Sequence, residues 1–254
     1  STPIKSSAAS DVYKRQFGRI GNVSVSPDGS KAVYDITYFN KEEDRGYSDL
    51  YLMNLPEGQT TRLTDTDYNE SDAGWTPDGK FITYLAKGQL WEMNPDGSNP
   101  RQVTDIPDGI NGYVYAPDMS KIVYLKDVQL EPTVQDLYPD LPKAKARIVD
   151  DQFYRHWNDW VDAYTHLFIA DYVPAQPITT GKDIMEGERW ESPVRPWGGV
   201  EQLAWTKDGK KLIYTCRKKI GIDYAESTNT DLYAYNTENG ETVNLTEGMM
   251  GYDK

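Results

Sequence analysis

Four copies of one short turn divide the chain into similar segments, and this repetition constrains the fold more than any other feature. In each copy a β-rich run leads through a Pro-Asp-Gly-like turn into a second run, and a third run and a closing run follow. The turn aspartates are Asp28, Asp78, Asp118 and Asp208. The first three lie 50 and 40 residues apart. A unit of four short strands with this period is typical of a blade of a β-propeller.

The turn residues explain why each copy should form a hairpin. Proline sets the φ angle of the first turn position, aspartate bonds back to the backbone, and glycine adopts the positive φ that closes the turn. The third copy has Met119 where the other three have glycine. We therefore expect a different type of turn in the third copy.

The repeat predicts an all-β fold, a partial β-propeller of about four four-stranded antiparallel blades that is open at its C-terminal end. The blades are expected at residues 17–66, 67–106, 107–180 and 200–247. An insertion at residues 130–165 lengthens the third blade, whose predicted closing pair is Ile178 and Thr179. Residues 248–254 resemble the start of a further blade, and residues 1–16 are expected to be a disordered leader or a sequence artefact.

The charge balance and the lack of long apolar runs exclude several classes of partner. The 254 residues include 40 Asp and Glu against 27 Lys and Arg, a formal net charge of −13. Such a surface repels phosphate backbones, so nucleic acid is not an expected partner. No run approaches the roughly 18 apolar residues of a membrane span, and no signal peptide is recognisable in residues 1–16. The single cysteine, Cys216, excludes an internal disulfide and a thiolate-rich metal site.

Motifs for catalysis are missing from this stretch of sequence. A hydrolase nucleophile needs G-x-S-x-G, and the nearest string, residues 46–50, lacks the second glycine. The two histidines, His156 and His166, have no metal-site spacing, and His166 begins a repeat strand, where we expect a structural role. We therefore predict no catalytic triad, no metal and no cofactor in these 254 residues.

Two irregular stretches contain the candidate substrate-binding residues. The insertion has a dense aromatic segment with Trp157 and Asp159, which either packs the insertion onto its blade or lines a pocket. The loop at residues 181–199 contains Glu186 and Glu188. Carboxylates on a loop bind an amino group through charge-assisted hydrogen bonds, but a solvated loop in an acidic protein has the same composition.

Several strings resemble the propeller of the prolyl oligopeptidase family of serine peptidases. These are Ser-Val-Ser-Pro-Asp-Gly-Ser-Lys at 24–31, Ser-Asp-Leu-Tyr-Leu-Met-Asn at 48–54, Ala-Trp-Thr-Lys-Asp-Gly-Lys-Lys at 204–211, and Asp-Leu-Tyr at 231–233. The bacterial dipeptidyl-peptidase and acylaminoacyl-peptidase branches have a similar His-Trp-x-x-Trp-x-Asp segment before a His-Leu-Phe strand, as at 156–162 and 166–168 here. The resemblance covers about residues 18–246.

The resemblance implies a substrate-gating N-terminal propeller of a serine exopeptidase that releases short N-terminal units from peptides. In that family a C-terminal α/β-hydrolase domain, absent from this chain, carries the serine, aspartate and histidine. Some members hold the peptide amino group with propeller glutamates, but no motif here matches them residue by residue. Glu186, Glu188, Trp157 and Asp159 are therefore hypotheses. Short peptides are the implied partners, a homodimer is left open, and the branch implies a periplasmic or secreted parent.

Two other functions stay open at this point. Non-enzymatic propellers of the periplasmic translocation type use similar Asp-Gly-bearing blades as protein-docking modules. A complete four-bladed enzyme would need a polar cluster in its central channel, and the sequence does not identify one. Further blades and a G-x-S-x-G motif after Lys254 would favour the peptidase, whereas closure and a stop codon would favour docking.

Overall fold

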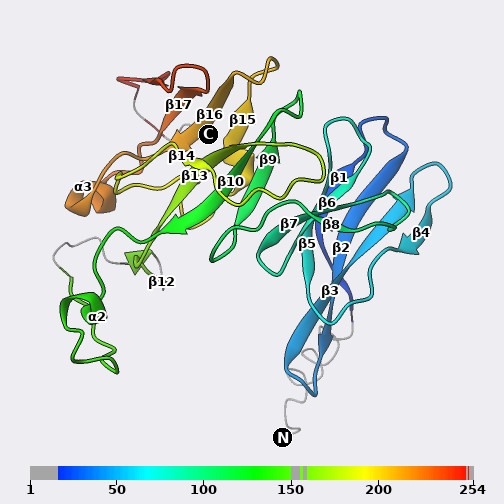
Figure 1. Cartoon of the computed structure of the whole chain (residues 1–254), viewed down its shortest axis with the longest axis horizontal. Helices are drawn as coiled ribbons and strands as arrows, with labels where there is room; N and C mark the ends of the chain where they lie inside the picture. Colours follow the sequence, from blue (N-terminus) through cyan, green and yellow to red (C-terminus); the bar gives the residue numbers. More distant parts are fainter. Residues whose placement is uncertain (1–16, 150–154, 157–158, 250, 252–254) are drawn as a thin grey trace, which may run out of the picture. The chain divides into compact units, whose positions relative to one another are not determined.

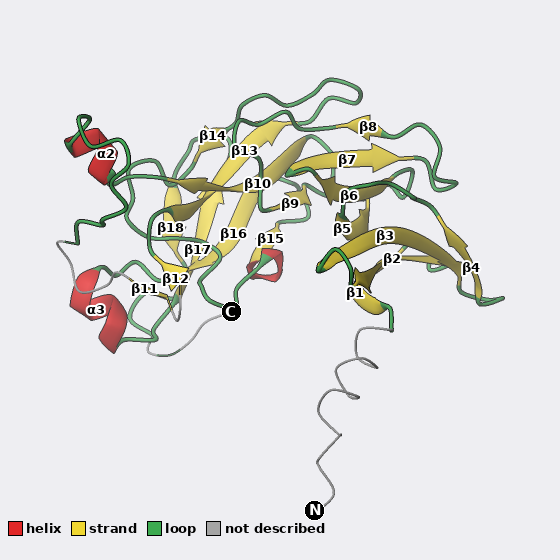
Figure 2. Ribbon diagram, turned by 90° about the horizontal axis from the view of Figure 1, so that it is seen from below, coloured by secondary structure: helices red, strands yellow, loops and turns green. Residues whose placement is uncertain are grey.

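The computed structural model describes residues 17–149, 155–156, 159–249 and 251. Within these residues the strands form four four-stranded antiparallel sheets and one two-stranded ribbon, and helices are few and short (Figures 1 and 2). The predicted all-β fold, a partial β-propeller of four-stranded antiparallel blades, is confirmed. In the same residues, no helix has the length and apolar character of a membrane span.

Each sheet consists of strands in simple up-and-down order along the chain. Blade 1 contains β1 (Arg19–Val25), β2 (Lys31–Asn40), β3 (Arg45–Asn54) and β4 (Gln59–Arg62). Blade 2 contains β5 (Glu70–Trp75), β6 (Ile82–Ala86), β7 (Gln89–Met93) and β8 (Arg101–Gln102). Blade 3 contains β9 (Gly112–Tyr115), β10 (Lys121–Val128), β13 (Tyr164–Asp171) and β14 (Lys182–Asp183). Blade 4 contains β15 (Leu203–Trp205), β16 (Lys211–Cys216), β17 (Asp231–Asn236) and β18 (Thr242–Asn244).

The remaining elements lie in the connections. The insertion between β10 and β13 contains α2 (Val134–Leu137) and the ribbon of β11 (Arg155–His156) and β12 (Asp159–Trp160). The 3-10 helix η1 (Val200–Gln202) precedes β15, and α3 (Gly221–Glu226) lies between β16 and β17. The predicted insertion at residues 130–165 therefore falls where the second and third strands of blade 3 separate.

The chain divides into two compact units, each containing two blades. Unit 1 comprises Ser1–Gly109 and Val173–Thr179, and unit 2 comprises Ile110–Tyr172 and Thr180–Lys254. We call the side of each blade that carries Tyr34, Tyr84, Tyr124 or Tyr214 its face A, and the opposite side its face B.

Within each unit, face B of one blade packs against face A of the next. In unit 1, Val33 and Leu50 of blade 1 share a buried cluster with Ile82, Tyr84 and Met93 of blade 2. In unit 2, residues of blade 3 face B pack against residues of blade 4 face A; the cluster includes Val123, Leu125, Leu167, Leu203, Leu212, Tyr214 and Tyr233. Burial of this apolar area is the main driving force for stacking the blades.

The turn of the third repeat is of the same type as the others, so the prediction of a different turn is wrong. Met119 has φ of +61°, within a few degrees of Gly209 at +66°. Its N–H donates to the Ala116 carbonyl at 2.9 Å, as the Gly209 N–H does to Thr206. Asp118 holds this conformation, because its Oδ1 accepts the backbone N–H of Ser120 at 3.0 Å. Met119 therefore occupies a left-handed backbone conformation that favours glycine.

The fourth strand of blade 3 also differs from the expectation. β14 pairs with β13 through Phe168 and Asp183, so the blade extends beyond residue 180. The predicted closing pair is wrong: the Ile178 N–H donates to the Val103 carbonyl, and the Ile178 carbonyl accepts from Asp105, both within unit 1. The Ile184 N–H donates to the Leu167 carbonyl, just as the Leu63 N–H donates to the Leu50 carbonyl in blade 1. Met185 therefore occupies the position at which blade 1 has a threonine, so the Leu-Thr pattern that ends the other blades is missing at the true end of blade 3.

Candidate functional site

Two of the four predicted binding residues lie on the loop that follows β14. Glu186 is exposed and Glu188 is half-buried, and the Glu188 N–H donates to the Met185 carbonyl at 2.9 Å. Asp159 lies in β12, where its backbone pairs with His156, and Trp157 lies outside the described residues. Glu186 and Glu188 thus lie two positions apart on one loop, and both stay predictions, as do Trp157 and Asp159.

A fully buried histidine anchors this loop to blade 3. His166 Nδ1 lies 2.8 Å from Asp183 Oδ2, and its Nε2 lies 3.0 Å from the Glu188 carbonyl oxygen. A carbonyl oxygen only accepts hydrogen bonds, so Nε2 donates to Glu188. The structural role predicted for His166 is confirmed, and one of its bonds fixes the backbone of Glu188.

The His166–Asp183 pair has counterparts in two other blades, where the third strand meets the fourth. In blade 1, Arg62 Nη2 donates to Asp49 Oδ2 at 2.7 Å. In blade 4, Asn244 Nδ2 donates to Asp231 Oδ2 at 3.1 Å. Blade 3 has the acid on the fourth strand and the donor on the third, the reverse of the other two. The His166–Asp183 pair is therefore the blade 3 form of a contact that blades 1 and 4 also make. In blade 3 the histidine also bonds to the Glu188 carbonyl.

A buried acid in the same loop was not nominated from the sequence. Only 4% of Glu191 is exposed. Arg195 Nε lies 3.4 Å from its Oε2, and Tyr224 in α3 donates to its Oε1 at 3.4 Å. Its backbone carbonyl accepts the Cys216 thiol at 3.4 Å. The carboxylate is thus removed from water and faces a guanidinium, which is the usual arrangement for a buried charge.

Cationic and aromatic side chains surround Glu191. The Arg217 guanidinium carbon lies 3.6 Å from the centre of the Tyr224 ring, and its Nη1 donates to the Ser227 carbonyl at 2.9 Å. Burial raises the pKa of Tyr224, and the Glu191 charge adds to the rise. Among the described residues, the Trp190 Nε1 and Arg217 Nε atoms are buried without a hydrogen-bond partner. We call these residues the Glu191 cluster: Trp190, Glu191, Arg195, Arg217 and Tyr224.

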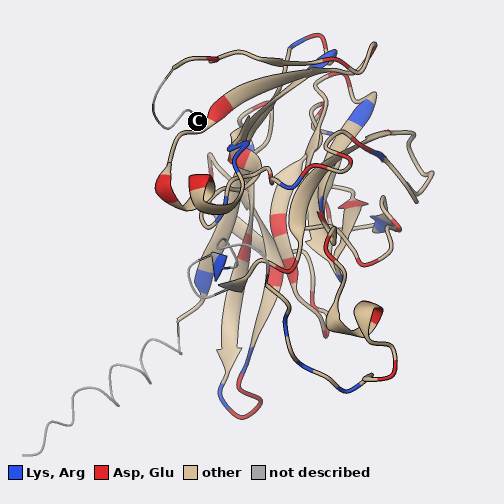
Figure 3. Cartoon of the chain, turned by 90° about the vertical axis from the view of Figure 1, so that its left-hand side faces the viewer, with Lys and Arg blue, Asp and Glu red and all other residues tan. Residues whose placement is uncertain are grey.

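The Glu191 cluster concentrates positive charge in an otherwise acidic chain. Asp and Glu residues are spread over the strands and loops (Figure 3). Arg195 Nη2 also contacts Asp127 at 3.2 Å and Thr165 at 3.0 Å, so it links the loop to β10 and β13. Lys218 Nζ lies 4.6 Å from the centre of the Tyr233 ring.

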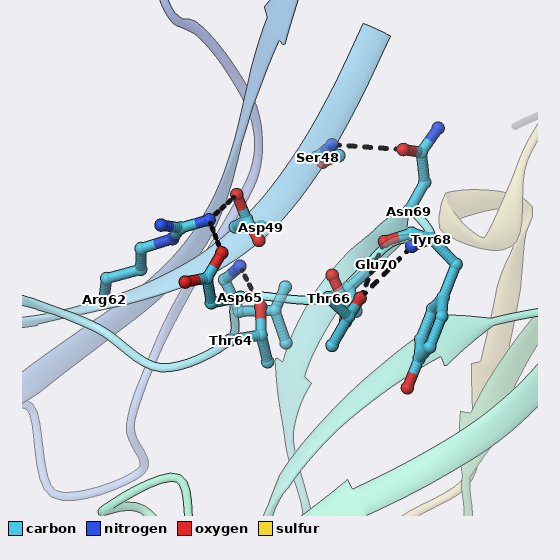
Figure 4. A network of polar contacts seen from close by, with 10 residues as sticks. Ser48, Asp49, Arg62, Thr64, Asp65, Thr66, Tyr68, Asn69 and Glu70 are labelled. Atoms are coloured by element: carbon cyan, nitrogen blue, oxygen red, sulfur yellow. Dashed lines mark hydrogen bonds and ion pairs between the residues drawn. The ribbon is translucent and has the colours of Figure 1, made fainter.

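A second polar network, in unit 1, joins blade 1 to blade 2 (Figure 4). The Ser48 N–H donates to Asn69 Oδ1 at 3.2 Å, and the Thr66 hydroxyl donates to Glu70 Oε1 at 2.7 Å. Glu70 is 1% exposed, and burial raises its carboxyl pKa. Thr64 Oγ1 accepts the Leu50 N–H at 2.9 Å. These bonds connect the linker between the blades to the blades themselves, which is a structural role.

Comparisons with known proteins test the resemblance. No family model matches the chain. Dipeptidyl-peptidase 5 of Porphyromonas gingivalis is 42% identical over 241 residues, which are 93% of this chain and 35% of that protein. Dipeptidyl-peptidase 5 of Porphyromonas endodontalis is 41% identical over the same shares. The acylaminoacyl peptidase of Pyrococcus horikoshii shares the fold with a TM-score of 0.65, at 16% identity, over 93% of this chain and 33% of that one. The resemblance to the prolyl oligopeptidase family propeller is confirmed.

The chain matches only part of each curated relative. The chain spans about a third of its curated relatives, 35% in each case. Across the described residues, no group of three or more His, Cys, Asp or Glu could hold a metal ion. The histidine that might have served a catalytic triad, His166, is fully buried in a structural pair.

Proposed function

We propose that this chain is the substrate-gating propeller of a serine exopeptidase of the dipeptidyl or acylaminoacyl type. Hydrolysis would be performed by an α/β-hydrolase domain outside the 254 residues. The observation that carries the proposal is the 42% identity to a dipeptidyl-peptidase 5 over 93% of this chain. In this division of labour, the propeller selects short peptides, and the other domain forms and hydrolyses the acyl-enzyme.

Within that function, the loop from Glu186 to Glu191 binds the amino end of the peptide. Glu186 is exposed and Glu188 is held by His166, so both carboxylates can meet a ligand ammonium group without a large rearrangement. Charge-assisted hydrogen bonds of this kind are stronger than neutral ones. Trp157 and Asp159 remain candidates for the same surface.

The test uses the full-length parent enzyme and its release of dipeptides from peptides with a free amino terminus. Glu186→Gln and Glu188→Gln, combined, should raise KM at least tenfold with little change in kcat, because binding of the ammonium group is lost in ground and transition states alike. The matched control is Glu226→Gln, an exposed acid in α3. It should leave KM unchanged.

A second substrate separates this role from a general loss of fold. N-acetylated peptides have no ammonium group, so their cleavage should be equally fast in the double variant and in the wild type. Unchanged KM for free-amino peptides in the double variant would remove the loop from the site. If the full-length protein had no peptidase activity and bound a folded protein through this propeller instead, the alternative function of a protein-docking module would be favoured.

A further inference from the structure

Every blade carries an aromatic pair on its face A, where its second strand lies opposite its third. The registers pair Tyr34 with Tyr51, Tyr84 with Trp91, Tyr124 with Phe168, and Tyr214 with Tyr233. In blades 1, 3 and 4 the two rings stack, with centres 5.9, 5.3 and 5.6 Å apart. The pair is therefore part of the repeat, and an addition to it in one blade is not a requirement of the fold.

Blade 4 adds a lysine to this pair. Alternate residues of a strand lie on the same face, so Lys218 follows Tyr214 on face A, just beyond the end of β16. Lys218 Nζ lies 4.6 Å from the centre of the Tyr233 ring. The equivalent positions of the other blades are uncharged, namely Tyr38, Gly88 and Val128. The lysine is thus specific to the blade that the acidic loop precedes.

The loop after β14 brings a second ring to this lysine. Lys218 Nζ lies 5.4 Å from the centre of the Trp190 ring. Both distances are within the roughly 6 Å at which a cation is attracted to the face of an aromatic ring, and tryptophan attracts it most strongly. We call the rings of Trp190 and Tyr233 the aromatic bracket. One ammonium group thus contacts two rings from different parts of the chain.

Contacts within unit 2 hold the aromatic bracket in place. Tyr233 is 7% exposed and belongs to the buried cluster that joins blades 3 and 4, and Trp190 packs against the same cluster. Glu191, the residue after Trp190, is also buried, and its carbonyl accepts the Cys216 thiol at 3.4 Å. The bracket is therefore formed between two blades of this chain. Partial removal from water strengthens the attraction of its rings for a cation.

A loop carboxylate lies near the aromatic bracket as well. Glu188 precedes Trp190 by two positions, and its backbone carbonyl accepts a hydrogen bond from His166. Burial raises the pKa of the Cys216 thiol, the Lys218 charge opposes that rise, and the Glu188 charge adds to it. Both charges thus lie close to one buried group. An ammonium group in the bracket meets two ring faces in the field of a carboxylate, and both favour a cation.

We propose that the aromatic bracket binds the ammonium group of the substrate and that Lys218 occupies it in the free chain as an internal competitor. The inference rests on the proposed function, because it names the rings that an amino terminus contacts beside Glu188. Lys218 is tethered, so its ammonium is present at a high effective concentration and the peptide has to displace it. The flexible stem of Lys218 lets the displaced ammonium turn into water. A peptide without a free amino group cannot replace the lost ring contacts, so the competition selects for free amino termini.

Kinetics of the full-length parent enzyme test the competition. Lys218→Met keeps most of the stem and removes the ammonium group, so KM for free-amino peptides should fall at least threefold with little change in kcat. Lys219→Met removes the same charge one position further along the chain and, as the matched control, should leave KM unchanged. An equal fall in both variants would mean that net charge sets KM, and a higher KM in Lys218→Met would mean that Lys218 helps to hold the peptide. Either result would overturn the proposal.

Lysine labelling of the same parent tests the aromatic bracket without an activity measurement. Tetramethylammonium binds to ring faces, and because it has no N–H group it does not consume an amine-reactive reagent. Replacing sodium chloride by tetramethylammonium chloride at constant ionic strength should raise the labelling of Lys218 at least twofold, measured by peptide mass spectrometry, and leave Lys219 unchanged. Unchanged labelling of Lys218 in excess tetramethylammonium would overturn the proposal. A parent that shows the displacement but does not cleave free-amino peptides would retain the bracket as a cation site, and the failure would then be that of the proposed function.

Discussion

His166 Nδ1 lies 2.8 Å from Asp183 Oδ2 in a site where the imidazole is fully buried and the carboxylate is 15% exposed. A second pair in the same blade, Lys121 of β10 with Asp171 of β13, is as close at 2.6 Å, but its carboxylate is 79% exposed. The two pairs therefore differ in burial much more than in distance. Burial decides how much the loss of one partner costs, because a charge left alone in the interior is not compensated by water.

The first prediction compares these two pairs. Asp183→Ala should lower the free energy of unfolding by about 3 kcal/mol, because it leaves the buried imidazole without its acceptor. Asp171→Ala should lower it by less than about 1 kcal/mol, as is usual for exposed pairs. Urea denaturation followed by tryptophan fluorescence measures both. Equal losses in the two variants would contradict the assignment of His166 as a buried anchor.

The second prediction concerns the turn of blade 3. Met119→Gly should raise the free energy of unfolding by about 1 kcal/mol, because glycine adopts a φ of +61° without the steric cost that methionine has there. Chemical denaturation of both proteins measures the difference.

Gly29 supplies the reciprocal test of the same physical cause. It has φ of +72° and open space around its Cβ position. Gly29→Met should therefore lower stability by about 1 kcal/mol through the backbone alone. If Met119→Gly lowered the stability instead, contacts of the methionine side chain would stabilise the protein by more than the left-handed backbone conformation destabilises it.

The fold was predictable because its signal is local and repeated four times. A Pro-Asp-Gly-like turn between β-rich runs specifies a hairpin from a few adjacent residues. The two wrong predictions for blade 3 concern features that the local repeat pattern does not determine. The hydrogen bond from Ser120 to Asp118 holds the turn even with Met119 in it, and Met185 replaces the threonine that marks the end of the other blades. Both features depend on hydrogen bonds to other residues of the fold, which the repeat pattern in the sequence does not reveal.

The candidate site was only partly predictable. The acidic loop could be located because residues 181–199 lack the strand pattern of the repeats, although Lys182–Asp183 at its start form β14. Glu191 was not nominated, because its burial depends on Tyr224 in α3, which lies 33 positions further along the chain. The one local signal is Arg195 four residues after Glu191. Tertiary packing alone distinguishes this acid from its exposed neighbours.

The third prediction tests the Glu191 cluster as a charge-balanced unit. Arg195→Ala should lower the free energy of unfolding by about 3 kcal/mol, because it removes a guanidinium that faces a buried carboxylate. Glu191→Gln, added to Arg195→Ala, should recover part of this loss, since the buried group is then neutral. A double-mutant cycle in urea measures the coupling between the two residues.

An exposed pair provides the comparison for that cycle. Arg147 forms a two-bond contact with Asp162 in the insertion, and the two side chains are 43% and 60% exposed. Arg147→Ala should therefore leave the denaturation midpoint almost unchanged. Additive effects of Arg195→Ala and Glu191→Gln would show that the two charges do not interact.

The fourth prediction is a pH dependence that arises at Glu70. Burial raises the pKa of this carboxyl, the nearby Asp49 charge raises it further, and the hydrogen bond from Thr66 opposes the rise. The folded state therefore binds the Glu70 proton more tightly than the unfolded state, whose glutamate pKa is about 4.3. The contribution of Glu70 to the free energy of unfolding is therefore fully present below the unfolded-state pKa and is lost as pH rises through the folded-state pKa.

Glu70→Gln removes the ionisation and should abolish that loss. The variant should be more stable than the wild type at pH 7, and the difference should shrink as pH falls toward about 4.3, because below that value the wild-type carboxyl is increasingly protonated in both states. Thermal denaturation between pH 4 and 8 measures the difference, with Glu57→Gln in the exposed β3–β4 turn as the matched control. A stability difference that stays constant over this range would mean that Glu70 is ionised in the folded protein and that the network in Figure 4 stabilises its charge.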